Sequence, residues 1–493
     1  MPLFQPTSLP ITLIVLAVLM LGSALLGGAS HRAGVPIVLA VLALGLAAGS
    51  GGLTAVLSRH LGADFNFGTV ALLLILFDGG LNTPLGLLSS GLFPALLLAT
   101  LGVVITATVV GLCAHWFGFP WTHAFLLGAI VAPTDAAAVF PILRGSGLQL
   151  KKRVGTTLEL ESGLNDPVAV TLTLALTQNL FRHHALTPAP LLAIPCALLI
   201  GGAMGLAIGY GGRLLLSRVS LPAGGLYPIV TLALALFAFG APAFLLGSGF
   251  LAVYAAALII GNGALPYRGG ILRVHDAAAW LCQIALYLLL GALALPAELL
   301  RVAPVGVALA LFLALIARPF SVALCLLPFR YPPREIVYIG WIGLRGAVPI
   351  VLAIYPVLAG VDGARSIFNL IFFIVAVSTI IPGATVRWMT AALRLKADEP
   401  SPPPAVLEII STRVLTGAEI LSFTVSKSSA ACGAQISDLP LPADATVVLL
   451  IRDRELIPPR GATALTPGDH VYVLCRPEDR ALVHLLFGRA ESD

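Results

Sequence analysis

The chain has 493 residues, of which 58% are hydrophobic and only 10% are charged. A water-soluble fold of this length could not bury or solubilise that much apolar surface, so residence in a membrane is expected. The formal net charge of +5 comes from basic residues scattered between apolar runs, which form no patch of the kind that binds nucleic acid. Charged residues are more than twice as dense after Ser401 as before it, which predicts a lipid-embedded part followed by a soluble part.

Several sequence signals are missing. The six cysteines show no CxxC or CxxH spacing, so neither a disulfide framework nor a zinc site is indicated. The motifs HExxH, GxSxG and GxxxxGK[ST] are absent, which argues against a membrane enzyme and an ATP-driven pump. No basic residue precedes Arg32, so the first apolar run lacks the start of a secretory signal and is expected to stay in the mature protein.

Apolar stretches of about 20 residues, the length that crosses about 30 Å of hydrocarbon, recur along the first 391 positions. We predict thirteen transmembrane helices, centred near residues 18, 43, 75, 102, 131, 168, 200, 232, 253, 285, 314, 345 and 377. The predicted fold class is an α-helical polytopic membrane protein followed by a small α+β cytoplasmic domain.

Basic residues mark the side of the membrane on which each loop lies. Eleven lie in loops on the side of the C-terminus: Arg32, Arg144, Lys151, Lys152, Arg153, Arg213, Arg218, Arg268, Arg273, Arg330 and Arg334. Four lie in the opposite loops: Arg59, Arg182, Arg301 and Arg365. The excess predicts a cytoplasmic C-terminus and an N-terminus outside.

A proline-rich polar segment, 398–404, follows the last predicted span and favours a domain boundary near residue 400. We predict a transmembrane exchanger domain over 1–395, a linker over 396–405 and a regulatory domain over 406–490. Within the last, alternating apolar residues predict strands at 418–425, 446–451 and 471–475, a hairpin turn at 452–455 and a closing helix at 478–487.

Placing an ionisable side chain at the bilayer centre costs about 2.5 to 3.5 kcal/mol. Such residues inside predicted spans are therefore expected to form ion pairs or to take part in function. Seven such residues occur: Asp78, Asp135, Glu159, Glu161, Asp166, Arg318 and Arg345.

The fifth and sixth spans carry a set of oxygen-bearing side chains. Ser162 and Asp166 stand four residues apart and so share one helix face. Pro133 removes a backbone donor just before Thr134 and Asp135, which predicts a helix break that frees carbonyl oxygens. Carboxylates, hydroxyls and carbonyls are the ligands that hard cations prefer, so these residues form a candidate site for Na⁺ or K⁺.

The twelfth span is interrupted in the same way, by Gly343, Gly346 and Pro349. It lies seven spans after the fifth, and an odd offset inverts its orientation. Paired interrupted helices in opposite orientation are typical of inverted-repeat transporters with a site at the membrane midplane. Arg345 in this break needs an anion; Glu161 is the expected partner, which leaves Asp166 free to exchange a proton for a cation.

Structural readings compete with these assignments. Asp135 and Asp166 could instead form ion pairs that hold helices together. Glu159, and Arg318 before Pro319, favour a structural or interfacial role, and Asp78 fits either role. The nine histidines lie mainly near span ends, and none is predicted to be a ligand.

The chain resembles the monovalent cation:proton antiporters of family one, because the motifs 133–135, 161–166 and 343–349 occur together and in order. The resemblance covers nearly all of the first 395 residues and implies the sodium/proton antiporter fold. It also implies the site roles. Asp166 would be the main cation- and proton-binding carboxylate, with Asn165 before it; Thr134, Asp135 and Ser162 would complete the site; Glu161 would pair with Arg345; and Asp78 falls where relatives often carry Glu.

The resemblance further implies a homodimer in the bacterial inner membrane, each protomer with a dimerisation domain and a mobile six-helix core. The tail is similar to the C-terminal ligand-binding (RCK-C, or TrkA-C) module of proteins that regulate potassium conductance, through the motifs 438–440 and 465–469. A nucleotide is a candidate ligand of that module, and no other cofactor is expected. Some such antiporters continue into a further domain, and regulation through it is expected to be absent from a chain ending at Asp493.

The expected function is secondary active exchange of a monovalent cation for H⁺ by alternating access, which regulates cytoplasmic cation level and pH. The attached module favours K⁺ over Na⁺. Asn165 in place of a second acid favours electroneutral one-for-one exchange. The alternative is a potassium channel gated by the module. The sequence argues against it, because the only filter-like segment, 209–211 (Gly-Tyr-Gly), lacks the preceding Thr-Val of a potassium-selective filter.

Overall fold

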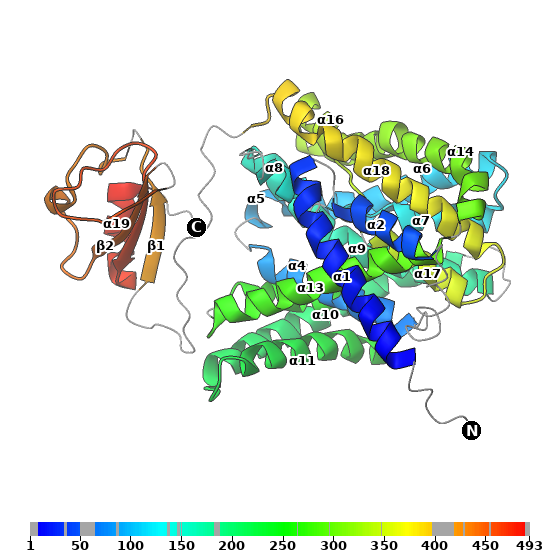
Figure 1. Ribbon diagram of the computed structural model, residues 1–493, viewed down its shortest axis with the longest axis horizontal. Coiled ribbons are helices and arrows are strands. Elements are labelled where there is room, and N and C mark those ends of the chain that lie inside the picture. The colour runs from blue at the N-terminus through cyan, green and yellow to red at the C-terminus, as the bar shows by residue number, and fades with distance from the viewer. Residues whose placement is uncertain are drawn as a thin grey trace.

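We describe the fold from a computed structural model of the chain. A helical part ends at residue 396 and a small α+β part begins at residue 419 (Figure 1). The structure describes residues 8–33, 37–49, 65–84, 88–135, 139–144, 148, 150–181, 188–263, 265–294, 296–346, 348–396, 419–426, 429–452 and 455–488.

Helices dominate the first part because a backbone in hydrocarbon must satisfy its hydrogen bonds within each segment. In chain order these are α1 (Ser8–Ala33), α2 (Ile37–Ala48), α4 (Phe65–Asn82), α5 (Leu88–Leu97), α6 (Val103–Trp116), α7 (Trp121–Val131), α8 (Val139–Arg144), α9 (Lys152–Phe181), α10 (Pro188–Arg218), α11 (Leu226–Gly240), α12 (Gly249–Gly261), α13 (Arg268–Leu293), α14 (Pro296–Phe312), α15 (Arg318–Leu326), α16 (Pro333–Trp341), α17 (Val348–Leu358) and α18 (Ala364–Ala392). Short π turns join α5 to α6 (η3, Leu98–Gly102) and α14 to α15 (η5, Leu313–Ala317), while 3₁₀ turns follow α11 (η4, Ala241–Leu245) and α15 (η6, Leu327–Phe329).

Six continuous helical stretches of the described chain are long and apolar enough to cross a bilayer: Gly91–Trp116, Ala193–Arg218, Leu226–Leu245, Arg268–Ala292, Ala297–Phe329 and Ala364–Ala392. Shorter apolar helices accompany them. Each of the thirteen predicted centres falls inside a described helix or turn, or, near residue 345, in the break between two helices. The number of spans itself stays a prediction.

The helices form two groups that differ in their contacts. One group, which we call the panel, consists of α1, α2, α4, α10, α11, α12 and α13. The other, which we call the bundle, consists of α5 to α9 and α14 to α18. Within each group the helices contact one another far more extensively than they contact the other group. In Figure 1 α16, α18 and α14 lie along one side of the helical part, and α10, α11 and α13 along the other.

Glycines let helices within each group approach closely, as is usual in membranes. In the panel, a Cβ atom at Gly45 of α2 would lie 2.6 Å from the Leu288 carbonyl oxygen of α13. In the bundle, a Cβ atom at Gly111 of α6 would lie 2.8 Å from a ring carbon of Phe125 on α7. Both groups are therefore tightly packed internally.

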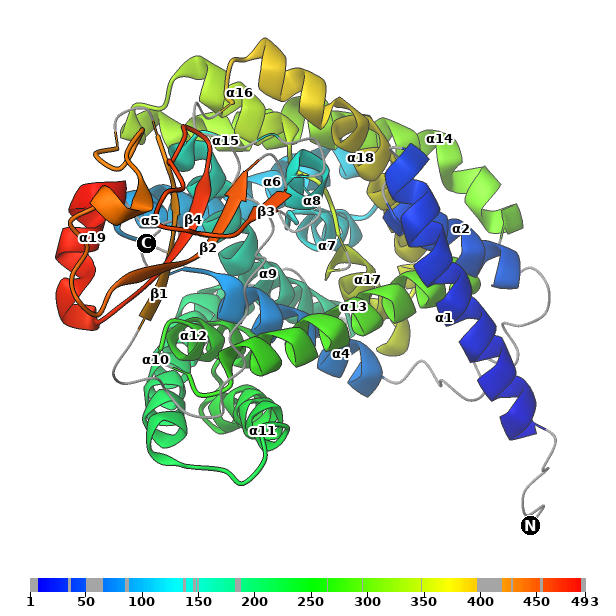
Figure 2. The ribbon, with the colours of Figure 1, turned by 60° about the vertical axis from the view of Figure 1, so that its left-hand side comes forward.

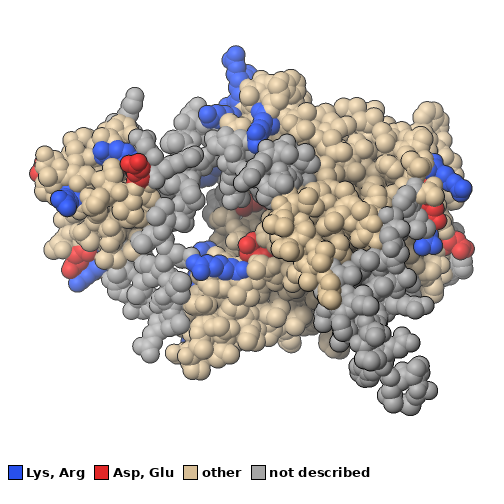
Figure 3. All heavy atoms as spheres, in the orientation of Figure 1, with Lys and Arg blue, Asp and Glu red and all other residues tan. Residues whose placement is uncertain are grey.

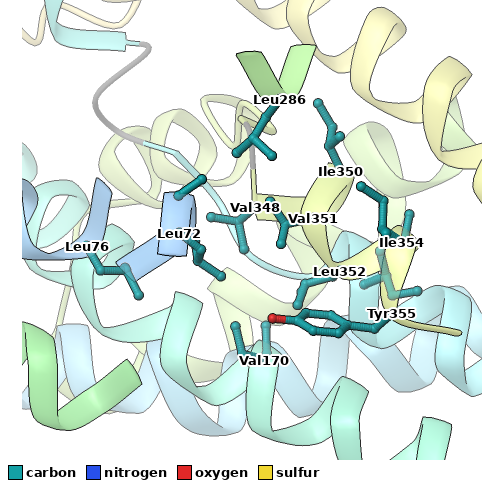
Figure 4. Packing of buried hydrophobic residues seen from close by; sticks show 14 of the residues in the cluster. Leu72, Leu76, Val170, Leu286, Val348, Ile350, Val351, Leu352, Ile354 and Tyr355 are labelled. Carbon is teal, nitrogen blue, oxygen red and sulfur yellow. The ribbon is translucent and has the colours of Figure 1, made fainter. Parts of the chain in front are cut away.

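Helix α17 makes an apolar contact between the bundle and the panel. Its buried side chains meet α4, α9 and α13 in one cluster, which Figure 4 shows from close by: Leu72, Leu76, Val170, Leu286, Val348, Ile350, Val351, Leu352, Ile354 and Tyr355. The Tyr355 hydroxyl also hydrogen-bonds to Thr69 Oγ1 of α4 at 3.1 Å. One half of a broken helix is thus seated between the two groups.

Two sets of loops gather at opposite ends of the helical part. At one end, the Lys151 N–H donates to the Leu395 carbonyl oxygen (2.9 Å), and Arg153 donates to the Phe329 carbonyl oxygen (2.7 Å). The Arg153 guanidinium also stacks 3.7 Å above the ring of Tyr331. These loops were all assigned by charge to the side of the C-terminus, and the contacts place them together.

At the other end, a ring nitrogen of His123, just inside α7, lies 2.7 Å from the Asp362 carbonyl oxygen before α18. In the view of Figure 3, a wide area of the helical part shows no Lys, Arg, Asp or Glu, and charged side chains appear towards its edges and on the small domain.

The small domain is a four-stranded antiparallel sheet with strand order β1-β4-β2-β3. Its strands are β1 (Glu419–Thr424), β2 (Thr446–Arg452), β3 (Glu455–Ile457) and β4 (His470–Cys475). Helix α19 (Arg480–Phe487) packs on it, and Figure 2 shows the helix on one face of the sheet. Phe423, Leu450, Val473 and Phe487 belong to its apolar core.

The three predicted strands and the closing helix are confirmed, each to within two residues at either end. The predicted hairpin is confirmed by the pairing of Arg452 with Glu455; the two residues between them lie outside the described chain. The sequence missed the short edge strand β3. The predicted linker, except for Lys396, also lies outside the described residues, and the domain boundaries stay predictions.

Candidate cation and proton site

Two interrupted helices cross inside the bundle. Helix α7 ends at Val131 and is followed by backbone without regular secondary structure over 132–135, where Pro133 cannot continue the helical hydrogen bonds. Helix α16 ends at Trp341, and backbone without regular secondary structure over 343–346 leads towards α17. The Asp135 N–H donates to the Leu344 carbonyl oxygen at 2.8 Å, so the two breaks meet directly. Both breaks predicted from the sequence are present.

Arg345 is buried and binds the ends of two helices. Its Nε donates to the Val131 carbonyl oxygen at 3.0 Å, and its Nη1 donates to the Gly343 carbonyl oxygen. Val131 ends α7, and Gly343 lies just past the end of α16. A helix C-terminus carries about half a negative charge, so the guanidinium finds its countercharge there.

Glu161 pairs with Arg318. The Arg318 Nη1 lies 2.5 Å from Glu161 Oε1, and its Nη2 donates to Oε2 at 2.8 Å. Both side chains are at most 2% exposed. The predicted pair of Glu161 with Arg345 is therefore wrong. From the sequence, either buried arginine could have paired with Glu161. In the folded chain Arg318 on α15 lies next to Glu161 on α9, and Arg345 binds two backbone carbonyl oxygens instead.

Asn165 links the site helix α9 to the first break. Its Nδ2 donates to Thr134 Oγ1 at 2.8 Å, and both side chains are buried. Among the described residues its Oδ1 atom is buried and has no hydrogen-bond partner. An unsatisfied buried carbonyl oxygen is costly. It is therefore available to a ligand that is not part of the protein.

The two aspartates of the prediction lie near each other. The Asp135 carboxyl packs on Gly346, where a Cβ atom would lie 2.6 Å from Asp135 Cγ, so a glycine is required there. Asp166 follows Asn165 on α9, and its carboxyl is close enough to that of Asp135 to repel it. No hydrogen bond or ion pair joins the Asp166 carboxylate to another residue of the described chain. Ser162 lies one helical turn before Asp166, as predicted.

Asp78 makes its hydrogen bonds outside this group. It lies on α4 of the panel, and Asn82 Nδ2 donates to both its carbonyl oxygen (2.9 Å) and its Oδ1 (3.0 Å). Its carboxyl interacts electrostatically with Asp276 of α13. In the described chain, no hydrogen bond joins Asp78 to the residues around Asp166, and its part in the site stays a prediction.

Sequence reasoning missed three polar features. Arg318 was predicted to be structural and was not considered as a partner of Glu161. Like Arg345, it lies in a predicted span and needs a negatively charged partner there. His275 was passed over with the other histidines, yet it is buried, and its Nε2 lies 2.8 Å from Thr231 Oγ1. Tyr254, buried between α4 and α9, carried no signal, because a tyrosine in an apolar run is unremarkable by pattern.

The family is decided by comparison with known proteins. Residues 18–392 match the family model described as "Sodium/hydrogen exchanger, transmembrane". The chain belongs to this family. Residues 420–488 match the TrkA-C domain, as the tail motifs indicated. The exchanger family match places the crossed breaks and α9 inside a transporter domain.

Relatives of known activity support the family. The K(+)/H(+) antiporter NhaP of Alkalimonas amylolytica is 39% identical over 486 residues, which cover 98% of this chain and 84% of that protein. The K(+)/H(+) antiporter NhaP2 of Shewanella oneidensis is 39% identical over 479 residues, covering 96% and 82%. The Na(+)/H(+) antiporter NhaS2 of Synechocystis is 28% identical over 425 residues, covering 83% and 76%.

The fold agrees with a solved exchanger. The sodium proton antiporter MjNhaP1 of Methanocaldococcus jannaschii superposes with a TM-score of 0.65 at 23% identity, covering 76% of this chain and 99% of that one. This sodium/hydrogen exchanger is therefore a cation/proton antiporter. The family is one of transporters and not of enzymes, and the alternative of a gated potassium channel is set aside.

Proposed function

We propose that this exchanger moves K⁺ against H⁺ at a site centred on Asp166, with Thr134, Asp135, Ser162 and Asn165 as its neighbours. The observation that carries the proposal is an Asp166 carboxylate that has no hydrogen bond or ion pair with any described residue, beside an Asn165 carbonyl oxygen that is also unsatisfied among them. A cation or a proton neutralises Asp166, but not both at once. Competition for one carboxylate therefore couples the two flows.

Asp166, Ser162 and Thr134 supply oxygen ligands for the transported cation, and Asp135 adds negative charge nearby. Asp78 is proposed to influence the site from the panel rather than to bind the ion. Its hydrogen bonds go to Asn82, and its carboxyl interacts electrostatically with Asp276. Hydrogen ions reach the same carboxylate when no cation is bound.

The test compares cation-induced collapse of a proton gradient in sealed vesicles that hold wild type or Asp166→Asn, with KCl and with NaCl. We expect collapse with KCl by wild type and a loss of at least a hundredfold in rate for Asp166→Asn. The matched control is Asp362→Asn, which removes a carboxylate from an exposed loop position and should keep the wild-type rate. Equal activity of Asp166→Asn would place the site elsewhere.

The choice of K⁺ rests on the TrkA-C domain and on relatives that are K(+)/H(+) antiporters. Collapse by NaCl but not by KCl would contradict it. We also propose electroneutral exchange, because a neutral Asn165 precedes Asp166 and leaves one titrating carboxylate there. A rate that changes with an imposed membrane potential would contradict this stoichiometry.

We further propose that the TrkA-C domain is cytoplasmic and regulates exchange in a bacterial inner membrane. Support comes from the segment that leads to it: Leu395 accepts a hydrogen bond from Lys151, and Leu150 and Lys396 form a β-bridge. Lys151 immediately precedes α9, the helix of Asp166. A movement of the tail can thus reach the site. Adenine nucleotides (ATP, ADP and AMP) are the first ligands to test, by their effect on transport rate in inside-out vesicles; no effect from any of them would exclude this ligand class.

A homodimer is proposed from the family and from the panel, where α10 and α11 expose large apolar side chains, among them Leu199, Tyr210, Ile229 and Phe237. Light scattering of the detergent-purified protein should give twice the protomer mass of 51.0 kDa. A protomer mass at all concentrations would contradict the dimer.

A further inference from the structure

A buried tyrosine of the panel faces the site helix. Tyr254 lies on α12 and is 2% exposed. Its hydroxyl hydrogen-bonds to Thr83 Oγ1 at 3.3 Å, and Thr83 in turn donates to the Gly79 carbonyl oxygen at 2.8 Å. Asn262 Nδ2 donates to the Thr83 carbonyl oxygen at 2.8 Å. The phenol is therefore held in place from the panel side, at the end of α4.

The same phenol rests on Gly163 of α9. A Cβ atom at position 163 would lie 2.6 Å from Tyr254 Cε2, and it would overlap Cζ and the hydroxyl oxygen more closely still. Only a residue without a side chain lets the ring lie there. Through this contact the panel touches the backbone of α9 at Gly163, where no side chain covers it.

Gly163 stands at the candidate site. Glu159 lies four residues before it and Asp166 three residues after it, so both are its neighbours on the helix surface. The Tyr254 hydroxyl interacts electrostatically with both carboxyl groups. The contact therefore lies about one helical turn from Asp166, towards the N-terminus of α9.

We propose that Tyr254 is a positioning residue for the exchange reaction, acting on Asp166 through Gly163. Fixed by Thr83, its phenol sets how closely α9 approaches the panel beside the site. The role rests on the proposed function of Asp166. Alternating access requires α9 to change its place relative to the panel, and a flat ring on bare backbone lets the two surfaces slide without interlocking. A methyl group at position 163 would block both the approach and the sliding.

The first experiment tests the contact with paired substitutions. Gly163→Ala should lower the maximal exchange rate at least tenfold, because the new methyl group collides with the phenol. Adding Tyr254→Leu removes all three colliding atoms and should restore at least a third of the wild-type rate. Gly202→Ala on α10 is the matched control: its new Cβ would have no atom nearer than 3.7 Å, and the wild-type rate should persist.

The second experiment separates positioning from packing and does not depend on how Gly163→Ala folds. Tyr254→Phe keeps the ring and loses the bond to Thr83; it should raise the apparent KM for K⁺ at least threefold and leave the maximal rate within twofold. Tyr338→Phe is matched, since the Tyr338 hydroxyl bonds to Thr390 Oγ1 at 2.6 Å between two helices of the bundle. Its KM should not change.

The outcomes are distinguishable from those that test the site. An inactive Asp166→Asn with Gly163→Ala at the wild-type rate would overturn the role of Tyr254 alone. So would an unchanged KM in Tyr254→Phe, or a folded Gly163→Ala that Tyr254→Leu does not rescue. Full activity of Asp166→Asn would overturn the site and this role with it.

Discussion

Two buried arginines of the bundle, Arg318 and Arg345, lie side by side and are neutralised in different ways. A Cβ atom at Gly343 would lie 2.6 Å from Arg345 Nη1 and 3.1 Å from Arg318 Nε, so both guanidinium groups reach this glycine. Arg318 forms an ion pair with the carboxylate of Glu161. Arg345 takes the carbonyl ends of α7 and α16. A buried charge thus finds its partner either in a side chain or in the end of a broken helix.

The difference teaches why the site can keep Asp166 unpaired. Arg345 donates its hydrogen bonds to backbone carbonyl oxygens near the ends of helices, and among the described residues none of them goes to a carboxylate. Arg318 and Glu161 satisfy each other, and neither draws on the aspartates. The interrupted helices therefore do two things: their carbonyl ends hold a cationic side chain, and their crossing brings Thr134 to Asn165.

The largest effect should come from breaking the carboxylate pair. Glu161→Gln leaves the Arg318 charge buried without its counterion, which costs about 3 to 5 kcal/mol. The double change Glu161→Met with Arg318→Met should be markedly more stable than either single change, because no charge is left alone. Thermal unfolding in detergent measures both. If the double variant unfolds as readily as Glu161→Gln, the pair is not what holds these side chains in place.

A smaller effect is expected at the second arginine. Arg345→Lys keeps the charge but can reach only one of the two carbonyl oxygens, so it should cost about 1.5 to 3 kcal/mol, the range for one hydrogen bond to a charged group. No carboxylate is orphaned. Arg318→Lys in the same unfolding assay is the matched control and should cost more, since it loses a two-pronged contact with Glu161. The reverse order would contradict the comparison.

The smallest effect is expected for a third arginine, Arg452, which is partly exposed to solvent. In the TrkA-C domain Arg452 donates to both carboxylate oxygens of the buried Asp469, at 2.8 Å each, and the Thr466 N–H donates to Oδ2 at 2.7 Å. Burial alone would raise the pKa of Asp469, but the hydrogen bonds from Arg452 and Thr466 outweigh it and hold the pKa below its ordinary value. Arg452 itself is one-third exposed, so solvent screens the pair.

Asp469→Asn should therefore cost only about 1 kcal/mol at neutral pH. Because the folded pKa is the lower one, the stabilisation by the charge is present above the unfolded pKa of about 3.9. It disappears as the pH falls through the folded value. Hydrogen exchange of β1 and β4 in the whole protein should differ between wild type and variant at pH 7 and equally at pH 5. A difference that shrinks already between pH 7 and pH 5 would contradict the lowered pKa.

Much of the fold followed from local pattern. Apolar runs of membrane length predicted where helices lie, since hydrocarbon forces each run to satisfy its own backbone. Pro133 and the glycines around Arg345 predicted the two breaks, because those residues change the backbone itself. In the small domain, alternating apolar residues predicted three strands and the hairpin, whereas β3 is three residues long and too short to show a period.

The sequence by itself determined which groups need a partner of opposite charge or a hydrogen bond. These are the charged side chains of Glu161, Arg318 and Arg345 inside the membrane part, and the backbone carbonyls freed at each helix break. Tertiary structure alone decided how they pair, because partners that are 157 residues apart, as Arg318 and Glu161 are, meet only when α15 has packed beside α9. The same holds for Tyr254 and Gly163. A charge, a proline or a glycine acts on the chain where it stands, but a contact between helices depends on distances that no local pattern contains.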